Sequence, residues 1–326
     1  MQMYKFEFNQ DLIRHLALHR GDGLTTVFQV FSFMGEIEGY LLVITALFVA
    51  YDKRLALQSA LVVLGAMIAN HLAKIIIQNP RPFVVDGDYR EHWAVSARNA
   101  AELAAEFSTP SGHAMAGAAF YGFLFLRIPS LPFRIGLVVA IIMVGASRPL
   151  IGVHYVEDIV LGWVLGAGIA LLAHRSLDRT LRAWSELSAA WRLLVVTALS
   201  ATVWVVTLQA LGRPLSQLPT AFVAYLGLLT GLLLTIPIEE RRLAFEPQGA
   251  SARVITMRFA VMIALLFGAL ALLDWLFAFV AAENSAMGFC PRFLRYAIVG
   301  VAGGLATPWL FFRLGLALRP EKFQPV

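Results

Sequence analysis

The chain has 326 residues, of which 59% are hydrophobic and 14% are charged, and its mean hydropathy is +0.72. Soluble domains are roughly 45–50% apolar and about 25% charged, so this composition excludes an ordinary soluble domain and indicates a polytopic membrane protein. The net charge of +5 does not indicate nucleic-acid binding, because the cations flank apolar segments. The single cysteine, Cys290, excludes an internal disulfide.

Residues 1–35 are the expected lead-in to the membrane, soluble or interfacial. The first 22 carry charges throughout and lack the apolar core and cleavage site of a signal peptide, whereas 23–35 either extend the first span or lie along the interface. Apolar segments then recur at the roughly 20-residue length that a helix needs to cross a bilayer. We therefore expect an all-α membrane bundle of about nine transmembrane helices. The expected spans are 36–51, 55–77, 111–128, 132–149, 154–173, 193–211, 218–236, 257–281 and 294–316.

The Lys and Arg residues divide unevenly between the two sides that this order of spans creates. Fifteen fall on one side and eight on the other, leaving out three that belong to a candidate site. Cytoplasmic loops carry the excess of positive charge, so the richer side is expected to be cytoplasmic. The amino terminus and the loops 78–110, 149–154, 212–217 and 282–293 then face outward. Short loops and an Ala- and Arg-rich composition are typical of a bacterial inner-membrane protein, in which outward means the periplasm; in a eukaryote it would mean the lumen.

A charged link at 174–192 separates five early spans from four late ones. We expect a catalytic core at 36–176 and a C-terminal extension of about four transmembrane helices at 177–326. Ionisable residues within or beside spans are functional candidates, and three clusters of them fall at the outer ends of the early spans. The late spans lack such a cluster, which favours helical packing there.

The first cluster is KIIIQNPRP, from Lys74 to Pro82. Lys74 and Arg81 are seven residues apart, about two helical turns, so both would face one point on a continuous helix. Pro80 is expected to end the helix and to turn Arg81 inward on a loop. Taken alone, this cluster is more typical of a snorkelling lysine and an interfacial arginine.

The second cluster is STPSGHAMAG, at 108–117. Pro110 followed by Ser111 as a cap predicts a helix start, whose free N–H groups and positive dipole end suit an anion. Gly112 would let the anion approach the backbone, and His113 would stand beside it. An ordinary capped helix with a tolerated histidine is the equal alternative.

The third cluster is SRPLIGVHYVEDIV, at 147–160. His154 and Asp158 are four residues apart and share a face if 154–173 is helical. An aspartate bonded to one imidazole nitrogen fixes the tautomer and leaves the other nitrogen free to act. Arg148 lies across the turn and can hold an anion in a planar fork. Alternatively, the His–Asp pair only ties two helix ends together. Glu157 lies off that face and is expected to be solvated or interfacial.

Together the clusters form K-x6-RP, then PSGH, then SR-x5-H-x3-D, in that order. This pattern resembles the signature of the type 2 phosphatidic acid phosphatase (PAP2) superfamily. For Ser147 the alternative of a hydroxyl that only caps a turn stays open. The matching residues are Lys74, Arg81, Pro82, Pro110, Ser111, Gly112, His113, Ser147, Arg148, His154 and Asp158.

The resemblance implies metal-independent removal of a phosphate from an ester through a phosphohistidine, with no cofactor. Phosphoryl transfer needs positioning and fixed positive charge around the equatorial oxygens, which the candidate phosphate-binding residues would supply. His154, oriented by Asp158, would attack phosphorus. His113 would protonate the departing alkoxide and then take a proton from the hydrolytic water. The phosphate-binding residues in this interpretation are Lys74, Arg81, Ser111, Gly112 and Arg148.

Two membrane branches of the superfamily are similar in topology. The resemblance to sphingosine-phosphate phosphatases extends to GEIEGY at 35–40 and to the last span at 295–312. That family, however, has PSTH where this chain has PSGH. Glucose-6-phosphatases share PSGHAM but act on a soluble sugar phosphate. Bacterial members also act on phosphatidylglycerophosphate, undecaprenyl diphosphate and lipid A. Because the site opens among apolar spans, a membrane lipid phosphate is favoured as substrate; a lipid phosphotransferase and a transporter on the same fold are the alternatives from other classes.

Glu36 and Glu38 lie in GEIEGY, at the outer level if the first span runs inward from there. Glutamates at a span end are often only solvated. The functional alternative is that one of them meets the ammonium of an amine-bearing headgroup, such as a sphingoid-base phosphate, which makes both candidate headgroup residues.

Overall fold

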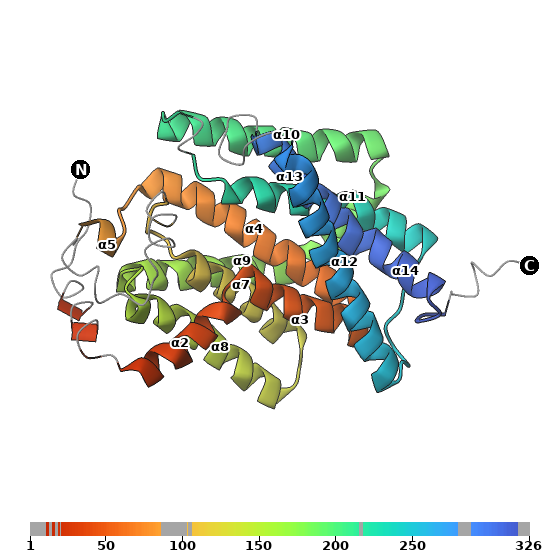
Figure 1. Ribbon diagram of the computed structural model, residues 1–326, viewed down its shortest axis with the longest axis horizontal. Coiled ribbons are helices and arrows are strands. Elements are labelled where there is room, and N and C mark those ends of the chain that lie inside the picture. Colours follow the sequence, from red (N-terminus) through yellow and green to blue (C-terminus); the bar gives the residue numbers. More distant parts are fainter. Residues whose placement is uncertain are drawn as a thin grey trace, which may run out of the picture. The chain divides into compact units, whose positions relative to one another are not determined.

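The computed structural model describes residues 11–12, 15–16, 19, 21–85, 103, 106–214, 218–279 and 288–318. Every regular element in those ranges is a helix (Figure 1), which confirms the predicted all-α bundle. Residues 1–10, 13–14, 17–18 and 20 of the expected lead-in, and much of the loop 78–110, lie outside the described ranges. The helices are α2 (Asp22–Met34), α3 (Ile37–Ala50), α4 (Lys53–Ile77), α5 (Pro82–Val85), α7 (Gly112–Arg127), α8 (Leu131–Ile151), α9 (Val156–Glu186), α10 (Ala189–Leu211), α11 (Ala221–Arg242), α12 (Ala252–Ala278), α13 (Phe289–Val301), the π-helix η4 (Ala302–Ala306) and α14 (Thr307–Arg313).

Each of the nine expected spans overlaps a helical segment, and the last, 294–316, overlaps α13, η4 and α14 together. Seven of the described helical segments are long and apolar enough to cross a membrane, and α2 with α3 makes an eighth if the bent pair is one span. The two helices of that pair meet at 57°. The remaining expected span, 111–128, overlaps α7, which has 16 residues and is shorter than the other candidate spans. The chain is an integral membrane protein.

Helix α9 is much longer than its predicted span. It begins at Val156 and continues to Glu186, through most of the charged link that was expected to follow residue 173. A helix of 31 residues is about 46 Å long, against about 30 Å for the hydrocarbon core of a bilayer. The drop in hydropathy therefore ends the apolar part of the segment and not the helix.

The chain divides into two compact units, described separately here: residues 1–40 with 66–176, and residues 41–65 with 177–326. In the first unit, α7 contacts α8, and α8 contacts α2. The buried face of α7 includes Phe120, Tyr121 and Phe123, and the Tyr121 hydroxyl donates to the carbonyl of Met34 at 2.7 Å. This packing fixes the ends of α2, α7 and α8, where the candidate residues lie.

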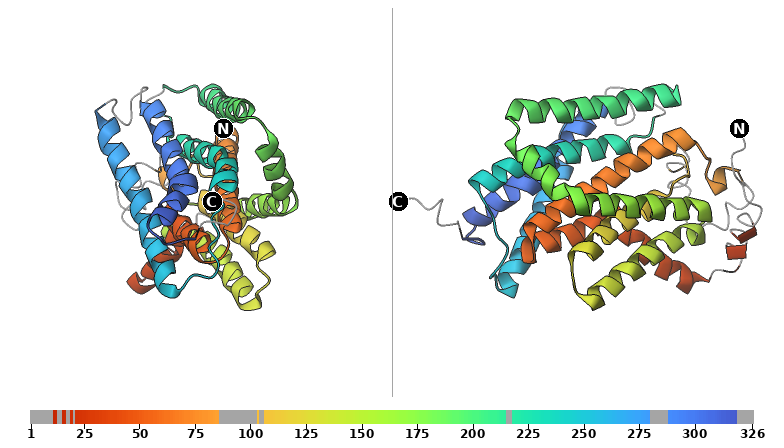
Figure 2. Two further views of the ribbon diagram at one scale, coloured as in Figure 1. Left: turned by 90° about the vertical axis from the view of Figure 1, so that its right-hand side faces the viewer. Right: turned by 180° about the vertical axis from the view of Figure 1, so that it is seen from behind.

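In the second unit, α11 packs along α13 (Figure 2). Gly231 and Gly300 meet at this contact, because a Cβ on Gly300 would lie 3.1 Å from the Cα of Gly231; such small residues let transmembrane helices approach closely. A buried ion pair joins Lys53 to Glu239 at 2.7 Å. Arg258 donates to the carbonyls of Pro247 and Leu316 among others. These buried charges hold helices and loops together.

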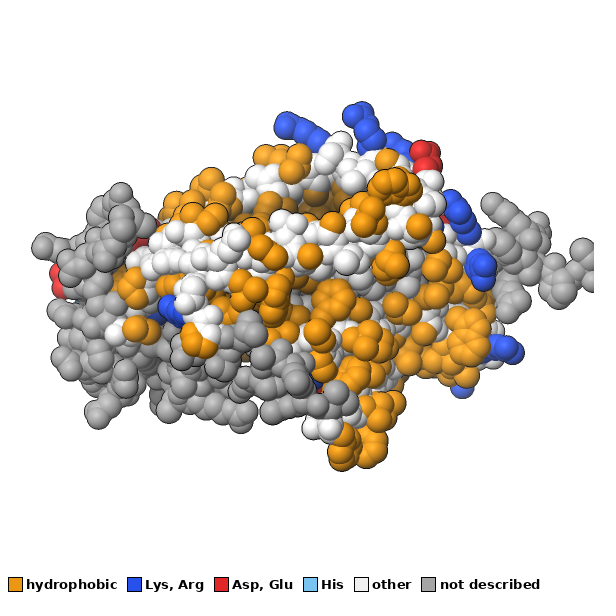
Figure 3. Space-filling model, turned by 90° about the horizontal axis from the view of Figure 1, so that it is seen from above, with side chains coloured by type: hydrophobic (Ala, Val, Ile, Leu, Met, Phe, Trp, Pro, Cys, Tyr) orange, Lys and Arg blue, Asp and Glu red, His pale blue; other side chains and the backbone are white. Residues whose placement is uncertain are grey.

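Hydrophobic side chains cover much of the visible surface in Figure 3. Large apolar residues are exposed along α8, α10 and α12, among them Ile142, Leu194 and Trp275. A soluble protein seldom exposes so much apolar area, whereas a lipid-facing surface requires it.

Candidate active site

The three sequence clusters come together in the first unit. His113 interacts electrostatically with Lys74, Arg81, Arg148 and His154, so residues from all three clusters share one buried location. The end of α4, the start of α7 and the junction of α8 with α9 supply them. The structure brings these residues together, and their roles in binding and catalysis stay predictions.

The predicted His154–Asp158 pair is formed, but not along one helix face. His154 precedes α9, which begins at Val156 and not at 154 as expected. Its Nδ1 lies 3.2 Å from Oδ2 of Asp158 in the first turn of α9. The N–H of Tyr155 also donates to Oδ2, at 2.9 Å. The aspartate therefore organises the helix start and the imidazole together.

Two further hydroxyls hold the same carboxylate. The Oγ of Ser108 donates to Oδ2 at 2.5 Å and lies 3.2 Å from Nδ1 of His154. The hydroxyl of Thr109 donates to Oδ1 and accepts from the Asn79 amide at 2.9 Å. A buried carboxylate with so many donors stays ionised, because hydrogen bonds to the charged form favour it.

Arg81 lies on the other side of the imidazole. Helix α4 ends at Ile77, before Pro80 as predicted, and the Arg81 side chain is buried. Its Nη1 is 3.2 Å from Nε2 of His154. A guanidinium only donates, so this Nε2 is the unprotonated nitrogen and Nδ1 carries the proton toward Asp158. Burial and the charge of Arg81 lower the pKa of His154, which keeps the ring neutral.

Lys74 is also buried, in the last turn of α4. Its Nζ forms an ion pair with Oε2 of Glu106 at 2.9 Å, and Nη2 of Arg81 lies 3.5 Å from the same oxygen. The charge of Lys74, followed by that of Arg81, lowers the pKa of Glu106 to about 2 against the cost of burial. The two predicted phosphate-binding cations therefore meet at one anion.

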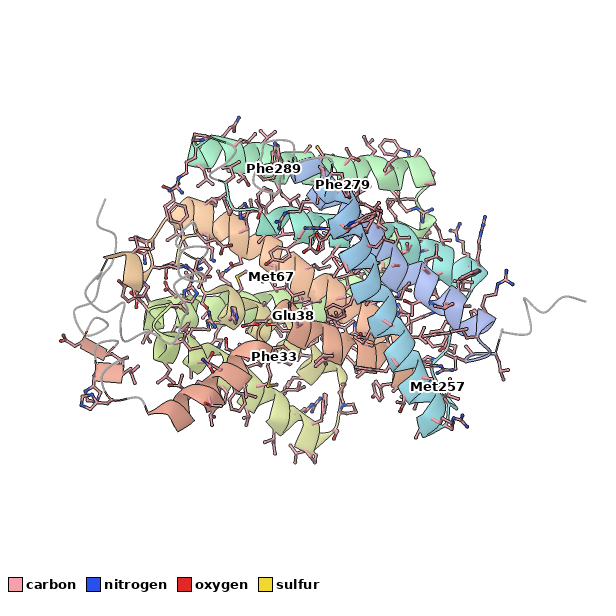
Figure 4. The ribbon with its side chains drawn as sticks, viewed as in Figure 1. Phe33, Glu38, Met67, Met257, Phe279 and Phe289 are labelled. Carbon is pink, nitrogen blue, oxygen red and sulfur yellow. The ribbon has the colours of Figure 1, made fainter. Side chains whose placement is uncertain are left out.

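The start of α7 has the predicted cap. Ser111 is the N-cap, and its side chain accepts from the N–H of Ala114 at 3.5 Å. Gly112 has a packing reason that the sequence did not indicate: a Cβ there would lie 3.3 Å from Oδ1 of Asn70, beside Met67 of α4 (Figure 4). The Asn70 amide donates to the carbonyl of Pro110 at 2.9 Å. The loop and the helix start are thus fixed to α4.

His113 is the second residue of α7. Its Nε2 is buried and has no hydrogen-bond partner among the described residues. The ring packs against Gly35 at the bend between α2 and α3, where a Cβ would lie 2.8 Å from Cδ2 of His113. No larger residue fits at position 35 without moving the imidazole.

Arg148 lies in the last turn of α8 and is buried. Its Nη1 donates to the Ser32 hydroxyl of α2 at 2.6 Å, and it interacts electrostatically with Glu36. The adjacent Ser147 donates to the carbonyl of Val144 at 2.7 Å, so its hydroxyl bonds within the helix. Glu38, labelled in Figure 4, is exposed in the first turn of α3.

The motifs did not indicate several residues of this site. Glu106 comes from the loop before α7, and Ser108 and Thr109 lie in the second cluster but had no predicted role. Ser32 in α2 and Gly35 after it belong to residues expected to lead in or to lie at the interface. The one signal for Glu106 is an acidic residue seven positions before His113 in a region otherwise rich in Ala. Among the described residues, no group of three or more His, Cys, Asp or Glu side chains has the geometry to hold a metal ion.

Two family models match the chain. One is described as the PAP2 superfamily and matches residues 55–182. The other is described as PAP2 superfamily phosphatase, transmembrane extension, and matches residues 223–319. The first match contains every residue of the three motifs.

Known proteins are similar over shorter stretches. Undecaprenyl-diphosphatase of Sulfolobus acidocaldarius is 35% identical over 68 residues, which is 21% of this chain and about a third of that relative's length (32%). The crystal structure of Aquifex aeolicus LpxE is 18% identical, with a TM-score of 0.45 over 54% of this chain and 99% of its own. That of a phosphatidylglycerolphosphate phosphatase from Bacillus subtilis is 25% identical, with a TM-score of 0.41 over 53% of this chain and 85% of its own.

Proposed function

The chain belongs to the PAP2 superfamily, and on this premise we propose that it hydrolyses the phosphate ester of a membrane lipid, through a phosphohistidine and without a metal ion. The observation that carries the proposal is the imidazole of His154, whose Nδ1 faces Asp158 and whose Nε2 faces Arg81. That arrangement presents a neutral nitrogen lone pair beside buried positive charge. Both are what attack on a phosphate anion requires.

In the first half of the reaction, Nε2 of His154 forms a bond to phosphorus while the bond from phosphorus to the ester oxygen breaks. The electron pair stays on that oxygen, and His113 supplies the proton that neutralises it. The negative charge of the bound phosphate offsets the neighbouring cations and so favours the protonated form of His113. Its buried Nε2 makes no bond to the described protein groups, which leaves it available to the leaving group. The lipid alcohol then departs.

In the second half, water attacks phosphorus and the bond from Nε2 to phosphorus breaks. His113, now neutral, takes the proton of the attacking water. Throughout, Lys74, Arg81 and Arg148 offset the negative charge of the phosphoryl oxygens. These groups are fixed before substrate arrives, and such preorganisation is usually the largest single contribution to catalysis.

A lipid substrate agrees with the extensive apolar surface of the helices and with the similarity to an undecaprenyl-diphosphatase. Within that class we propose a phosphate monoester, and a sphingoid-base phosphate as the first compound to test. Undecaprenyl diphosphate, phosphatidylglycerophosphate, lipid A and a sugar phosphate are the alternatives, and transfer to a second lipid is the alternative to hydrolysis.

We expect the purified protein to release inorganic phosphate from at least one lipid phosphate of this series. Activity should persist in EDTA, because the proposed steps use only side chains. Orthovanadate should inhibit it, because it mimics five-coordinate phosphorus at His154. Phosphate release is measured on each compound with and without the two reagents. A protein that releases no phosphate from any of them would refute the proposal. Activity that falls on chelation and returns with a divalent ion would contradict the metal-free mechanism.

Glu36→Gln should reduce kcat/KM about tenfold for sphingosine phosphate and leave phosphatidic acid unchanged. The carboxylate is exposed near Arg148, where it can meet the ammonium of an amine-bearing headgroup. A charge-assisted hydrogen bond of about 1.5 kcal/mol corresponds to this factor. Glu38→Gln, two residues away, is measured in the same way, because either glutamate is a candidate for this contact. Equal losses on both lipids in both variants, or no loss, would exclude amine recognition here.

We further propose that the site faces the periplasm of a bacterial inner membrane. In a background without Cys290, Arg213→Cys should react with an impermeant thiol reagent on intact cells. Arg182→Cys should react only after the membrane is opened, because it lies on the cation-rich side. Both positions are exposed in the described structure. The reverse labelling pattern would invert the topology.

A further inference from the structure

Among the described residues, Glu106 is the one acidic side chain that forms an ion pair with the proposed phosphate-binding cations Lys74 and Arg81. Its Oε2 lies 2.9 Å from Nζ of Lys74 and 3.5 Å from Nη2 of Arg81. A single carboxylate oxygen between a lysine and an arginine occupies the position that a phosphoryl oxygen needs. Lys74 first, and then Arg81, lower the pKa of this carboxyl to about 2, so the group is an anion at physiological pH.

Arg81 is not held in place by this carboxylate alone. Arg81 donates through Nε to the backbone carbonyl of residue 106 at 3.2 Å. It donates through Nη1 to the carbonyl of Val153 at 3.4 Å. Both acceptors belong to the main chain and remain after any change of the Glu106 side chain. The guanidinium therefore keeps its position when the carboxylate leaves.

The partners of this ion pair differ in exposure. The side chains of Lys74 and Arg81 are 10% and 2% exposed, whereas that of Glu106 is 31% exposed. A carboxylate that already reaches solvent can rotate outward at little cost in hydration. The two cations stay buried when the carboxylate leaves. Because a buried charge without a counter-ion is costly, they then require another anion. Any exchange at this site is thus an exchange of the anion.

We propose that Glu106 is a displaceable internal anion of the phosphate site, which the substrate phosphoryl group replaces and which returns when phosphate leaves. The inference rests on the proposed function, since it requires that Lys74 and Arg81 bind phosphate. Between turnovers the carboxylate keeps the cations neutralised. During binding it competes with the ligand, and so it sets the affinity of the site for phosphate and helps to release the product.

Glu106→Gln tests this with direct binding to the purified full-length protein. We expect the apparent Kd of orthovanadate and of inorganic phosphate, from ligand-induced shifts in melting temperature, to fall about tenfold. The amide keeps the size of the side chain but removes the competing charge. Glu246→Gln removes the same charge from an exposed position between α11 and α12, outside the proposed machinery, and should leave both Kd values within about twofold of the parent.

The outcomes separate this inference from the proposed function. A parent protein that hydrolyses lipid phosphate, together with a Glu106→Gln protein whose anion affinity is unchanged or weaker, would overturn the inference and leave the function standing. A parent that neither binds orthovanadate nor releases phosphate would refute the function itself. If Glu106→Gln does not fold, Glu106→Asp draws the charge back by one methylene and should still tighten anion binding, by about two- to threefold; no tightening would overturn the inference.

Discussion

Replacing His154 with alanine is expected to reduce phosphate release by about 10⁴-fold or more, the loss typical of removing a catalytic nucleophile. Asp158 cannot take over the attack, because Nε2 is the unprotonated nitrogen next to Arg81 and the carboxylate lies behind the ring. Turnover is measured with the best lipid substrate. A variant within tenfold of the parent would remove His154 from the nucleophilic role.

Measuring His113→Ala on two substrates with different leaving groups distinguishes the role of His113 from that of His154. General acid catalysis contributes about 10²–10⁴-fold and matters least when the leaving group needs no proton. His113→Ala should therefore be much slower on a lipid alkoxide but close to the parent on nitrophenyl phosphate. His154→Ala should be inactive on both. Gel-filtration profiles that match the parent show that either loss arises in the site and not from unfolding.

The fold could be predicted far into its details because transmembrane helices are specified by local composition. All nine expected spans correspond to helices, since the bilayer requires a minimum apolar length. The end of α9 could not be predicted in this way. The sequence HRSLDRTLRAWSE at 174–186 loses its hydropathy but contains no Gly or Pro, so nothing in it stops a helix. Hydropathy identifies where lipid ends, and helix breakers identify where the helix ends.

The candidate site could likewise be predicted only in part from the sequence. The pairing of His154 with Asp158, the cap at Ser111 and the turn before Arg81 follow from short spacings, and the structure contains all three. The contact of Ser32 with Arg148 joins residues 116 positions apart, and no local pattern encodes it. Glu106 was missed for a related reason: its importance comes from two cations on another segment, 32 and 25 residues away.

Asp158→Asn is expected to reduce kcat by about 10²–10³-fold with a small change in KM. The N–H of Tyr155 donates to the Oδ2 position and cannot rotate away, so it keeps the amide oxygen there. That oxygen still accepts from Nδ1 of His154, and the imidazole retains its tautomer. The amide nitrogen then faces the hydroxyl of Thr109, which can turn to accept. The substitution therefore removes the charge of Asp158 while preserving the orientation of the nucleophile.

The size of that loss reports how much positive charge develops on His154 in the transition state. In the proposed mechanism the ring becomes cationic as Nε2 bonds to phosphorus, and the nearby carboxylate stabilises this form more than the neutral one. A factor of 10²–10³ corresponds to about 2.7–4.1 kcal/mol of transition-state stabilisation. Asp158→Ala should be worse in both activity and thermal stability, because it leaves the donors of Ser108, Thr109 and Tyr155 unsatisfied in a buried position. If Asp158→Asn keeps more than a fifth of the parent kcat while Asp158→Ala is inactive, the aspartate only positions the ring, and the buried cations alone must stabilise the transition state.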